Sequence, residues 1–205
     1  ITLLAAHPPA KPNILFIVFD DMRPELGCYG TPIVQSPNID NLAKHSLVFD
    51  HAYVQLALCN PSRSSFLSGR RPQTINVFTL KKFLRTGNPD IITLPQFFKD
   101  NGYTALSFGK IFHTGNCNHE DNISWSEKPW KPGHNAATAT AVSNGVDAKD
   151  IETEDPNAKE LPVAAPDVSD EALPDGMVAD QALEALDKLA DHKEHPFFLG
   201  IGYYN

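Results

Sequence analysis

The sequence predicts an α/β fold in which helices cover both faces of a largely parallel, mixed sheet. Apolar runs rich in β-branched and aromatic residues at 13–19, 103–108 and 196–203 are typical of buried strands. Amphipathic stretches at 93–101 and 177–192 are typical of helices. Strands that alternate with helices favour a parallel sheet between helical layers. A chain of 205 residues is long enough to bury a substantial core.

The first strand is predicted over 13–19, where a continuous apolar run indicates burial on both faces and ends at Asp20. A short helix is predicted over 38–46, with Ser36 or Asn38 as its cap. A second helix is predicted to begin near Pro61, because proline favours the first turn of a helix. The stretch 114–175 is polar, proline-bearing and acidic in its second half. It predicts an irregular surface excursion rather than a domain of its own.

Asp20 and Asp21 form the first candidate site, because they follow a predicted strand at the carboxyl edge of the sheet, where α/β folds place ligands. Adjacent carboxylates repel each other unless a cation lies between them, and hard oxygen ligands favour Ca²⁺ or Mg²⁺ over zinc. The alternative is a solvated turn, since Asp is common after strands.

Cys59 is the second candidate, because it comes directly before the predicted helix start at Pro61, with Arg63 close behind. Helix amides and a guanidinium would stabilise an anionic or polar group at this position. A helix N-terminus also lowers the pKa of a thiol, so a plain thiolate nucleophile is one interpretation. The other is a small buried apolar residue, which is the commonest role of a lone cysteine.

Lys110 and His113 are the third candidate, because they leave the end of the strand predicted at 103–108 together. A lysine can neutralise an anionic oxygen, and a histidine can transfer a proton near neutral pH. Two solvated loop residues are the simpler interpretation of the same pattern.

The charge is unevenly spread, which bears on the kind of partner. Net charge is −8, yet residues 51–113 hold eight Lys/Arg and two Asp/Glu. A basic middle inside an acidic chain suits a small anionic substrate better than a nucleic acid, unless it is only a solvated basic face. Three cysteines (Cys28, Cys59 and Cys117) give no disulfide framework, and no stretch is long enough to span a membrane.

The segment from Cys59 to Gly69 resembles the signature C-x-P-S-R-x-x-x-L-x-S/T-G of type I sulfatases, which share the alkaline phosphatase superfamily fold. The likeness is greatest to the iduronate-2-sulfatase branch and runs from about Asn13 to the last residue. Four further segments resemble that branch: Asp20 to Pro24, Gly27 to Gly30, Ser36 to Asp40 and Gly109 to His113, the last with two residues between its Lys and His.

The resemblance implies a formylglycine-dependent sulfuric ester hydrolase. Asp20 and Asp21 would bind Ca²⁺, or Mg²⁺, together with an oxygen of a formylglycine made from Cys59. The hydrated aldehyde would attack sulfur, expel the sugar alcohol and then release sulfate. Arg63 would hold the formylglycine, Lys110 would bind a sulfate oxygen, and His113 would contact the substrate or assist at residue 59. The implied substrate is a sulfated sugar, with the 2-O-sulfate of a uronic acid favoured.

The resemblance also implies a domain layout and partners. Residues 1–12 would be a leader or signal remnant, and 13–205 the N-terminal part of the catalytic domain. The C-terminal remainder, in the same polypeptide or as a separate chain, would supply the other metal ligands, so this part alone would be inactive. A formylglycine-generating enzyme would act on Cys59. The protein would be exported: periplasmic or secreted in a bacterium, lysosomal in an animal.

Two other functions remain open from the residues. One is a phosphohydrolase of the same superfamily, although such enzymes usually use Ser or Thr as the nucleophile, which Cys59 argues against. The other is a non-catalytic protein that binds sulfated glycans, having kept the pocket but lost the chemistry.

Overall fold

A computed structural model describes residues 11–115, 118–132, 169–191 and 194–204. The chain divides into two compact units. The sheet unit comprises Ile1–Val18, Ile92–Ile111 and Asp121–Tyr203, and the site unit comprises Phe19–Ile91, Phe112–Glu120 and Tyr204–Asn205, each as far as it is described. Almost all of the predicted leader at 1–12, Cys117, and most of the predicted excursion at 114–175 lie outside the described residues. No helix in the described parts is both long enough and apolar enough to cross a bilayer.

Three strands form the sheet in the order β1-β3-β2: β1 (Ile14–Phe19), β2 (Thr104–Gly109) and β3 (Phe197–Tyr203). β2 and β3 are parallel, with Thr104 opposite Phe197 and Gly109 opposite Gly202. Each strand lies within one residue of its predicted bounds. The predicted α/β fold with a parallel sheet is therefore confirmed.

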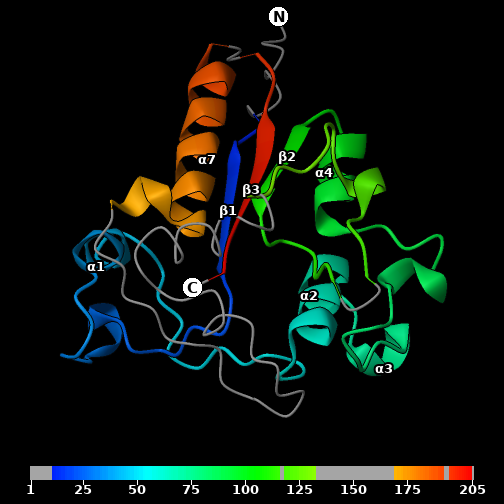
Figure 1. Ribbon diagram of the computed structural model, residues 1–205, viewed down its shortest axis with the longest axis horizontal. Coiled ribbons are helices and arrows are strands. Elements are labelled where there is room, and N and C mark those ends of the chain that lie inside the picture. Colours follow the sequence, from blue (N-terminus) through cyan, green and yellow to red (C-terminus); the bar gives the residue numbers. More distant parts are fainter. Residues whose placement is uncertain (1–10, 116–117, 133–168, 192–193, 205) are drawn as a thin grey trace, which may run out of the picture. The chain divides into compact units, whose positions relative to one another are not determined.

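Helices pack on both faces of β3, as the sequence predicts. On one face, Leu199 and Ile201 contact Val178 and Ala182 of α7 (Pro174–Ala190). On the other face, Phe198 stacks on Phe98 of α4 (Leu94–Asp100), with 5.2 Å between ring centroids. Figure 1 shows α7 and α4 on opposite sides of the strands. Phe198 is fully buried, and burying a side chain of this size contributes roughly 1.5–3 kcal/mol. The core of this unit is therefore built around β3.

Part of the predicted surface excursion is buried within the sheet unit. Trp130 pairs with the outer edge of β2: its N–H donates to Ser107 O at 2.9 Å, and its carbonyl accepts from Gly109 N at 2.9 Å. A short 3-10 helix (Asn122–Ser124) precedes it, and Ser124 is fully buried. The polar composition of this stretch predicts exposure, but polar side chains can be buried when they form hydrogen bonds with each other. Here Ser124 Oγ donates to Asp121 Oδ2 at 2.5 Å.

The prediction that the first strand is buried on both faces is wrong for the described residues. Leu15 is 51% exposed and Ile17 is 45% exposed, while the alternate residues of β1 are half-buried. α7 packs over β3 and β2 rather than over β1. A continuous apolar run predicts that both faces of a strand are covered, but it does not identify the segment that covers each face.

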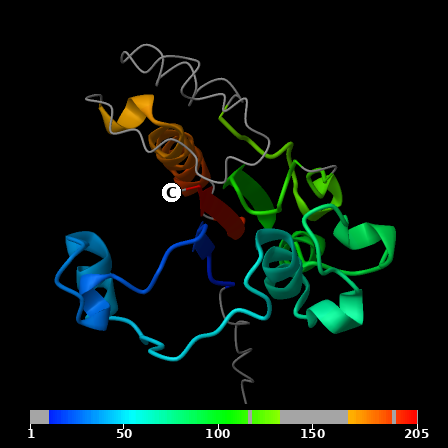
Figure 2. The same ribbon diagram turned by 60° about the horizontal axis from the view of Figure 1, so that its bottom comes forward.

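The site unit is built from short helices: α1 (Pro37–Ala43), α2 (Cys59–Ser68) and α3 (Pro72–Ile75), with 3-10 turns at Gly27–Tyr29 and Leu84–Thr86. α2 and α3 pack side by side (Figure 2). The predicted helix at 38–46 is shorter than expected, and α2 begins at Cys59, two residues before Pro61. The earlier start places Cys59 in the first helical turn.

Candidate active site

Asp20 and Asp21 follow β1 directly and differ in environment. Asp20 is only 7% exposed, whereas Asp21 is exposed and has a positive φ of 47°. Asp tolerates this left-handed conformation better than most residues, because its short side chain can bond to the local backbone. Non-glycine residues in this region are uncommon and cluster at functional sites. The predicted acidic pair is therefore a turn with one carboxylate held inside the protein.

Cys59 occupies the first turn of α2. The helix begins after Leu58, whose extended backbone precedes Cys59, and no side chain caps its first amides. Pro61 is tolerated in this turn because its missing N–H would have no helical acceptor there. The helix ends at Gly69, whose left-handed φ of 63° lets the chain turn away. Cys59 and Arg63 are four residues apart and therefore share one face of α2.

That face of α2 meets Asp20. Arg63 Nη2 lies 2.7 Å from Asp20 Oδ1, and the two side chains are 3% and 8% exposed. Cys59 Sγ lies 3.6 Å from Asp20 Oδ2. A buried carboxylate requires a charged or hydrogen-bonding partner, because transferring a lone charge out of water is very unfavourable. Arg63 offsets the charge of Asp20, and the second carboxylate oxygen faces the sulfur atom.

Asp20, Asp21 and Cys59 form a group that could bind a metal ion, since one ligand atom from each lies within 4.8 Å of the others. Two carboxylates suit a hard cation such as Ca²⁺ or Mg²⁺. The thiol fits such a cation poorly, because hard cations take oxygen ligands and sulfur prefers softer metals. The donor set thus fits Ca²⁺ if residue 59 presents an oxygen, and fits a softer ion such as Zn²⁺ if it presents a thiolate.

His113 belongs to the site unit, and Lys110 belongs to the sheet unit. His113 is 9% exposed, so the interpretation of a freely solvated loop residue is wrong for it. Lys110 follows β2, and its N–H donates to Gly202 O at 2.8 Å. The turn into Lys110 needs glycine at two positions. A Cβ on Gly109, whose φ is 72°, would lie 2.0 Å from Gly202 O, and a Cβ on Gly202 would lie 2.0 Å from Lys110 O.

Sequence reasoning missed Asn60, the residue after Cys59. Asn60 is 4% exposed, and its carboxamide donates to Thr79 O at 2.7 Å and to Lys82 O at 2.8 Å. An asparagine in a first helical turn is usually explained by local capping. Nothing in the sequence indicates that its partners lie about twenty residues further along the chain.

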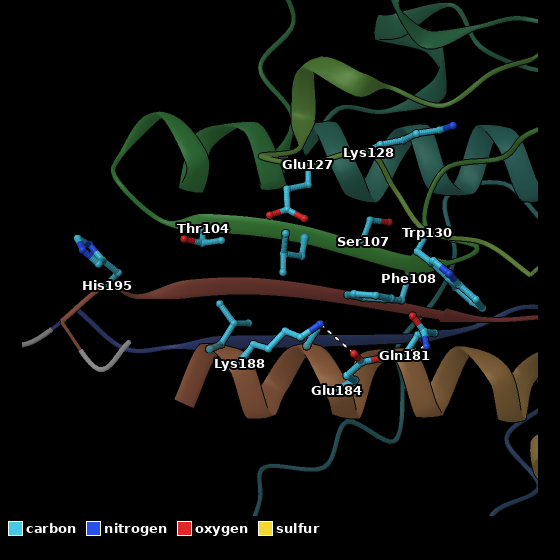
Figure 3. Close-up of a pocket in the computed structure, with 13 residues that line it drawn as sticks. Thr104, Ser107, Phe108, Glu127, Lys128, Trp130, Gln181, Glu184, Lys188 and His195 are labelled. Atoms are coloured by element: carbon cyan, nitrogen blue, oxygen red, sulfur yellow. Dashed lines mark hydrogen bonds and ion pairs between the residues drawn. The ribbon is translucent and has the colours of Figure 1, made fainter. Parts of the chain in front are cut away.

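A separate cavity of about 560 Å³ lies in the sheet unit, between α7 and the strand β2 (Figure 3). Trp130 and Phe108 form an apolar part of its wall, and Glu184 and Lys188 pair at its edge at 2.9 Å. The Lys188 ammonium lowers the pKa of Glu184 through a hydrogen bond and through its charge. None of the site residues predicted from the sequence lines this cavity.

Comparison with known proteins agrees with the motifs. A profile of the sulfatase family matches residues 12–205. The chain is 43% identical to the iduronate 2-sulfatases of Mus musculus and Homo sapiens over 196 residues, which is 94% of this chain and 34% of each relative. It therefore spans about a third of the length of the curated relatives that it matches.

Solved structures show the same fold at lower identity. A phosphonate monoester hydrolase of Agrobacterium radiobacter superposes with a TM-score of 0.70 at 18% identity, covering 95% of this chain and 41% of that one. A 2-O GAG sulfatase superposes with a TM-score of 0.60 at 23% identity, covering 96% of this chain and 35% of that one. The family profile over residues 12–205 and the 43% identity to the iduronate 2-sulfatases show that the chain belongs to the sulfatase family, near its iduronate 2-sulfatase branch.

Proposed function

We propose that the complete polypeptide containing this chain is a sulfuric ester hydrolase that removes sulfate from a sulfated sugar, with the 2-O-sulfate of a uronic acid as the favoured target. The observation that carries the proposal is the environment of the buried Asp20 carboxylate. Arg63 contacts one of its oxygens, and Cys59 contacts the other. Two relatives with this fold are named for 2-sulfates: the iduronate 2-sulfatases and the 2-O GAG sulfatase.

Asp20, Asp21 and residue 59 would hold a divalent cation, with Ca²⁺ favoured and Mg²⁺ as the alternative. The two carboxylates are the hard ligands that such ions prefer, and they already lie within reach of a common point. A bound cation would offset the negative charge on the sulfate oxygens. Arg63 offsets the charge of the Asp20 carboxylate and orients it, so that its other oxygen faces residue 59.

Cys59 would be converted to formylglycine by a maturation enzyme. Two observations support the conversion: the sulfatase signature around Cys59, and the poor match between a thiol and a Ca²⁺ site otherwise built from carboxylates. The converted residue would supply an oxygen nucleophile. Because Cys59 lies in the first turn of α2, the partial positive charge of the helix N-terminus favours negative charge on that oxygen.

Lys110 and His113 are the other two residues of this chain that we assign to catalysis. Lys110 would bind a sulfate oxygen as a point charge. His113 would transfer a proton to or from the reacting groups, which imidazole can do near neutral pH. Both roles rest on the match of the Gly109–His113 segment to the sulfatase pattern, with the burial of His113 as further support.

The remaining ligands and substrate contacts would come from the C-terminal remainder of the enzyme, in the same polypeptide or as a separate chain. Residues 13–205 would then be the N-terminal part of one catalytic domain and inactive alone. Action on glycosaminoglycans or other sulfated polysaccharides, and export to a periplasm, an extracellular space or a lysosome, follow from the same assignment.

The test is sulfate release by the complete protein, produced with and without a formylglycine-generating enzyme. We expect loss of sulfur from the Cys59 peptide by mass spectrometry only with that enzyme. Matured protein should then hydrolyse a 2-sulfated uronate disaccharide in preference to a 6-sulfated glucosamine. Chelation should abolish turnover, and Ca²⁺ should restore it better than Zn²⁺.

Matched variants separate the competing functions. Cys59→Ala should remove activity, whereas Cys28→Ala, which changes the other described free cysteine, should retain it. Faster release of phosphate than of sulfate from matched esters would indicate a phosphohydrolase. Binding of the sulfated sugar by a matured protein that releases no sulfate would indicate a non-catalytic glycan-binding protein and overturn the proposal.

A further inference from the structure

The carboxamide of Asn60 makes three hydrogen bonds inside the site unit. Its two N–H groups donate to Thr79 O at 2.7 Å and to Lys82 O at 2.8 Å. Its oxygen accepts from Ser64 Oγ at 3.3 Å, one helical turn further along α2. With two donors and one acceptor engaged, the orientation of the amide is fixed. The first turn of α2 is thereby attached to the loop 79–83.

This attachment restrains a helix end that has no side-chain cap, although it does not itself accept from the first amides of the helix. The residue before α2 is Leu58, and no side chain caps the helix there. An uncapped helix end frays more readily, because its first amide groups have no helical acceptor. The hydrogen bonds of Asn60 therefore restrain the turn in which Cys59 faces Asp20 Oδ2.

The same loop is held at a second place, by the segment that follows His113. The carboxamide of Asn118 donates to Leu80 O. The imidazole of His119 packs on Phe83, with 3.9 Å between ring centroids. The loop 79–83 thus contacts both the turn that carries Cys59 and the two residues Asn118 and His119, and all of these residues belong to the site unit.

We propose that Asn60 is a positioning residue, which holds residue 59 in place through the loop 79–83, itself held by Asn118 and His119. The inference rests on the proposed sulfatase function. Asn60 contacts none of the reacting groups itself. Its effect is geometric: small displacements of a reacting atom lower rates steeply, because the reaction requires the attacking atom and its partners in line.

Asn88 provides a matched control. Its carboxamide makes the same kind of bridge in the same unit, donating to Ile75 O at 2.8 Å and to Leu84 O at 2.9 Å, but neither partner belongs to α2 or to the loop 79–83. Asn60→Ala and Asn88→Ala each remove two hydrogen bonds to carbonyl groups. Each should lower the melting temperature to a similar extent, so a comparison of the two separates stability from positioning.

The experiment uses the complete, matured polypeptide, with rates divided by the fraction of residue 59 converted, as measured by mass spectrometry. Well below both melting temperatures, Asn60→Ala should lower kcat by about 10- to 100-fold, the range that a misplacement of about 1 Å can produce. KM should stay the same, because Asn60 is buried and contacts the loop backbone rather than substrate. Asn88→Ala should leave kcat unchanged.

Asn118→Ala tests the other end of the loop and stands in if Asn60→Ala does not fold. It should also lower kcat, and the double variant should lose less than the product of the two single effects, because both act through one loop. Equal kcat for the Asn60, Asn118 and Asn88 variants, after correction for conversion, would overturn the inference while leaving the sulfatase function intact. No sulfate release by the matured unsubstituted protein would overturn the proposed function and this inference with it.

Discussion

The two units each contain a carboxylate–cation pair of nearly the same length, in very different surroundings. In the site unit, Asp20 and Arg63 are 2.7 Å apart and their side chains are 8% and 3% exposed. In the sheet unit, Glu184 and Lys188 are 2.9 Å apart and 55% and 73% exposed. Because the two pairs are nearly equal in length and differ most in exposure, they show how burial changes what an ion pair contributes.

Access to water explains why the two ion pairs differ in their contribution to stability. Around Glu184 and Lys188, solvent screens the attraction and would solvate either charge if the other were removed. Around Asp20 and Arg63, neither charge can be solvated by bulk water, so each depends on the other and on its further neighbours. The exposed pair adds little to the fold, whereas the buried pair holds a carboxylate beside Cys59 in a defined geometry.

Removing one partner of the buried pair should have the largest effect. Arg63→Met should destabilise the complete protein by about 3–5 kcal/mol, because it leaves the Asp20 carboxylate buried without its cation. Thermal and urea unfolding in excess chelator would measure this. The chelator removes any contribution of a bound ion. Lys188→Met is the control and should leave the unfolding midpoint unchanged; equal effects of the two variants would contradict the comparison.

Removing both partners of the buried pair should reverse part of that loss. Asp20→Asn combined with Arg63→Met removes both charges of the pair, so the double variant should unfold at a higher temperature than Arg63→Met alone. Its activity should nevertheless stay absent, since Asp20 is a proposed metal ligand. For Glu184→Gln with Lys188→Met, the effects on stability should simply add. A double variant no more stable than Arg63→Met would show that Asp20 is not the group left unpaired.

Tyr203, in the sheet unit, provides an intermediate case. Partial burial, and secondarily the charge of Asp175, raise the pKa of Tyr203 above its ordinary value of 10.0. The folded state therefore favours the neutral phenol. This contribution to stability is complete below pH 10 and is lost as the pH rises through the folded-state pKa. Alkaline unfolding should begin at a higher pH in Tyr203→Phe than in the unsubstituted protein; an unchanged alkaline limb would contradict this.

Titration of the exposed pair should show the smallest effect. Lys188 lowers the pKa of Glu184 below 4.5, so its stabilisation is present above pH 4.5 and is lost as the pH falls through the folded-state pKa. Carboxyl NMR titration should show the pKa of Glu184 returning toward 4.5 in Lys188→Met and, partly, in high salt. A pKa that does not respond to salt would indicate a less solvated pair than the structure shows.

The sequence predictions succeeded where the structure depends on local interactions and failed where it depends on contacts between residues distant in sequence. The strands at 14–19, 104–109 and 197–203 were predictable, because apolar runs and turn residues are local signals. The group formed by Asp20, Asp21 and Cys59 was predictable only through the family resemblance, since 38 residues separate Asp21 from Cys59. The helix start at Cys59 and the burial of Asp121, Ser124 and Trp125 were not predictable, because both depend on partners distant in sequence.

By itself, the sequence determined the α/β class, the family and the residue types available for chemistry, because periodicity and an unbroken signature are properties of the chain alone. Only the tertiary structure decided that Asp20 is buried against Arg63, that Asn60 bridges α2 to the loop 79–83, and that β1 leaves apolar side chains exposed in the described part of the chain. The physical reason is that burial and hydrogen-bond partners are set by packing between distant segments, and no local pattern records which segments will meet.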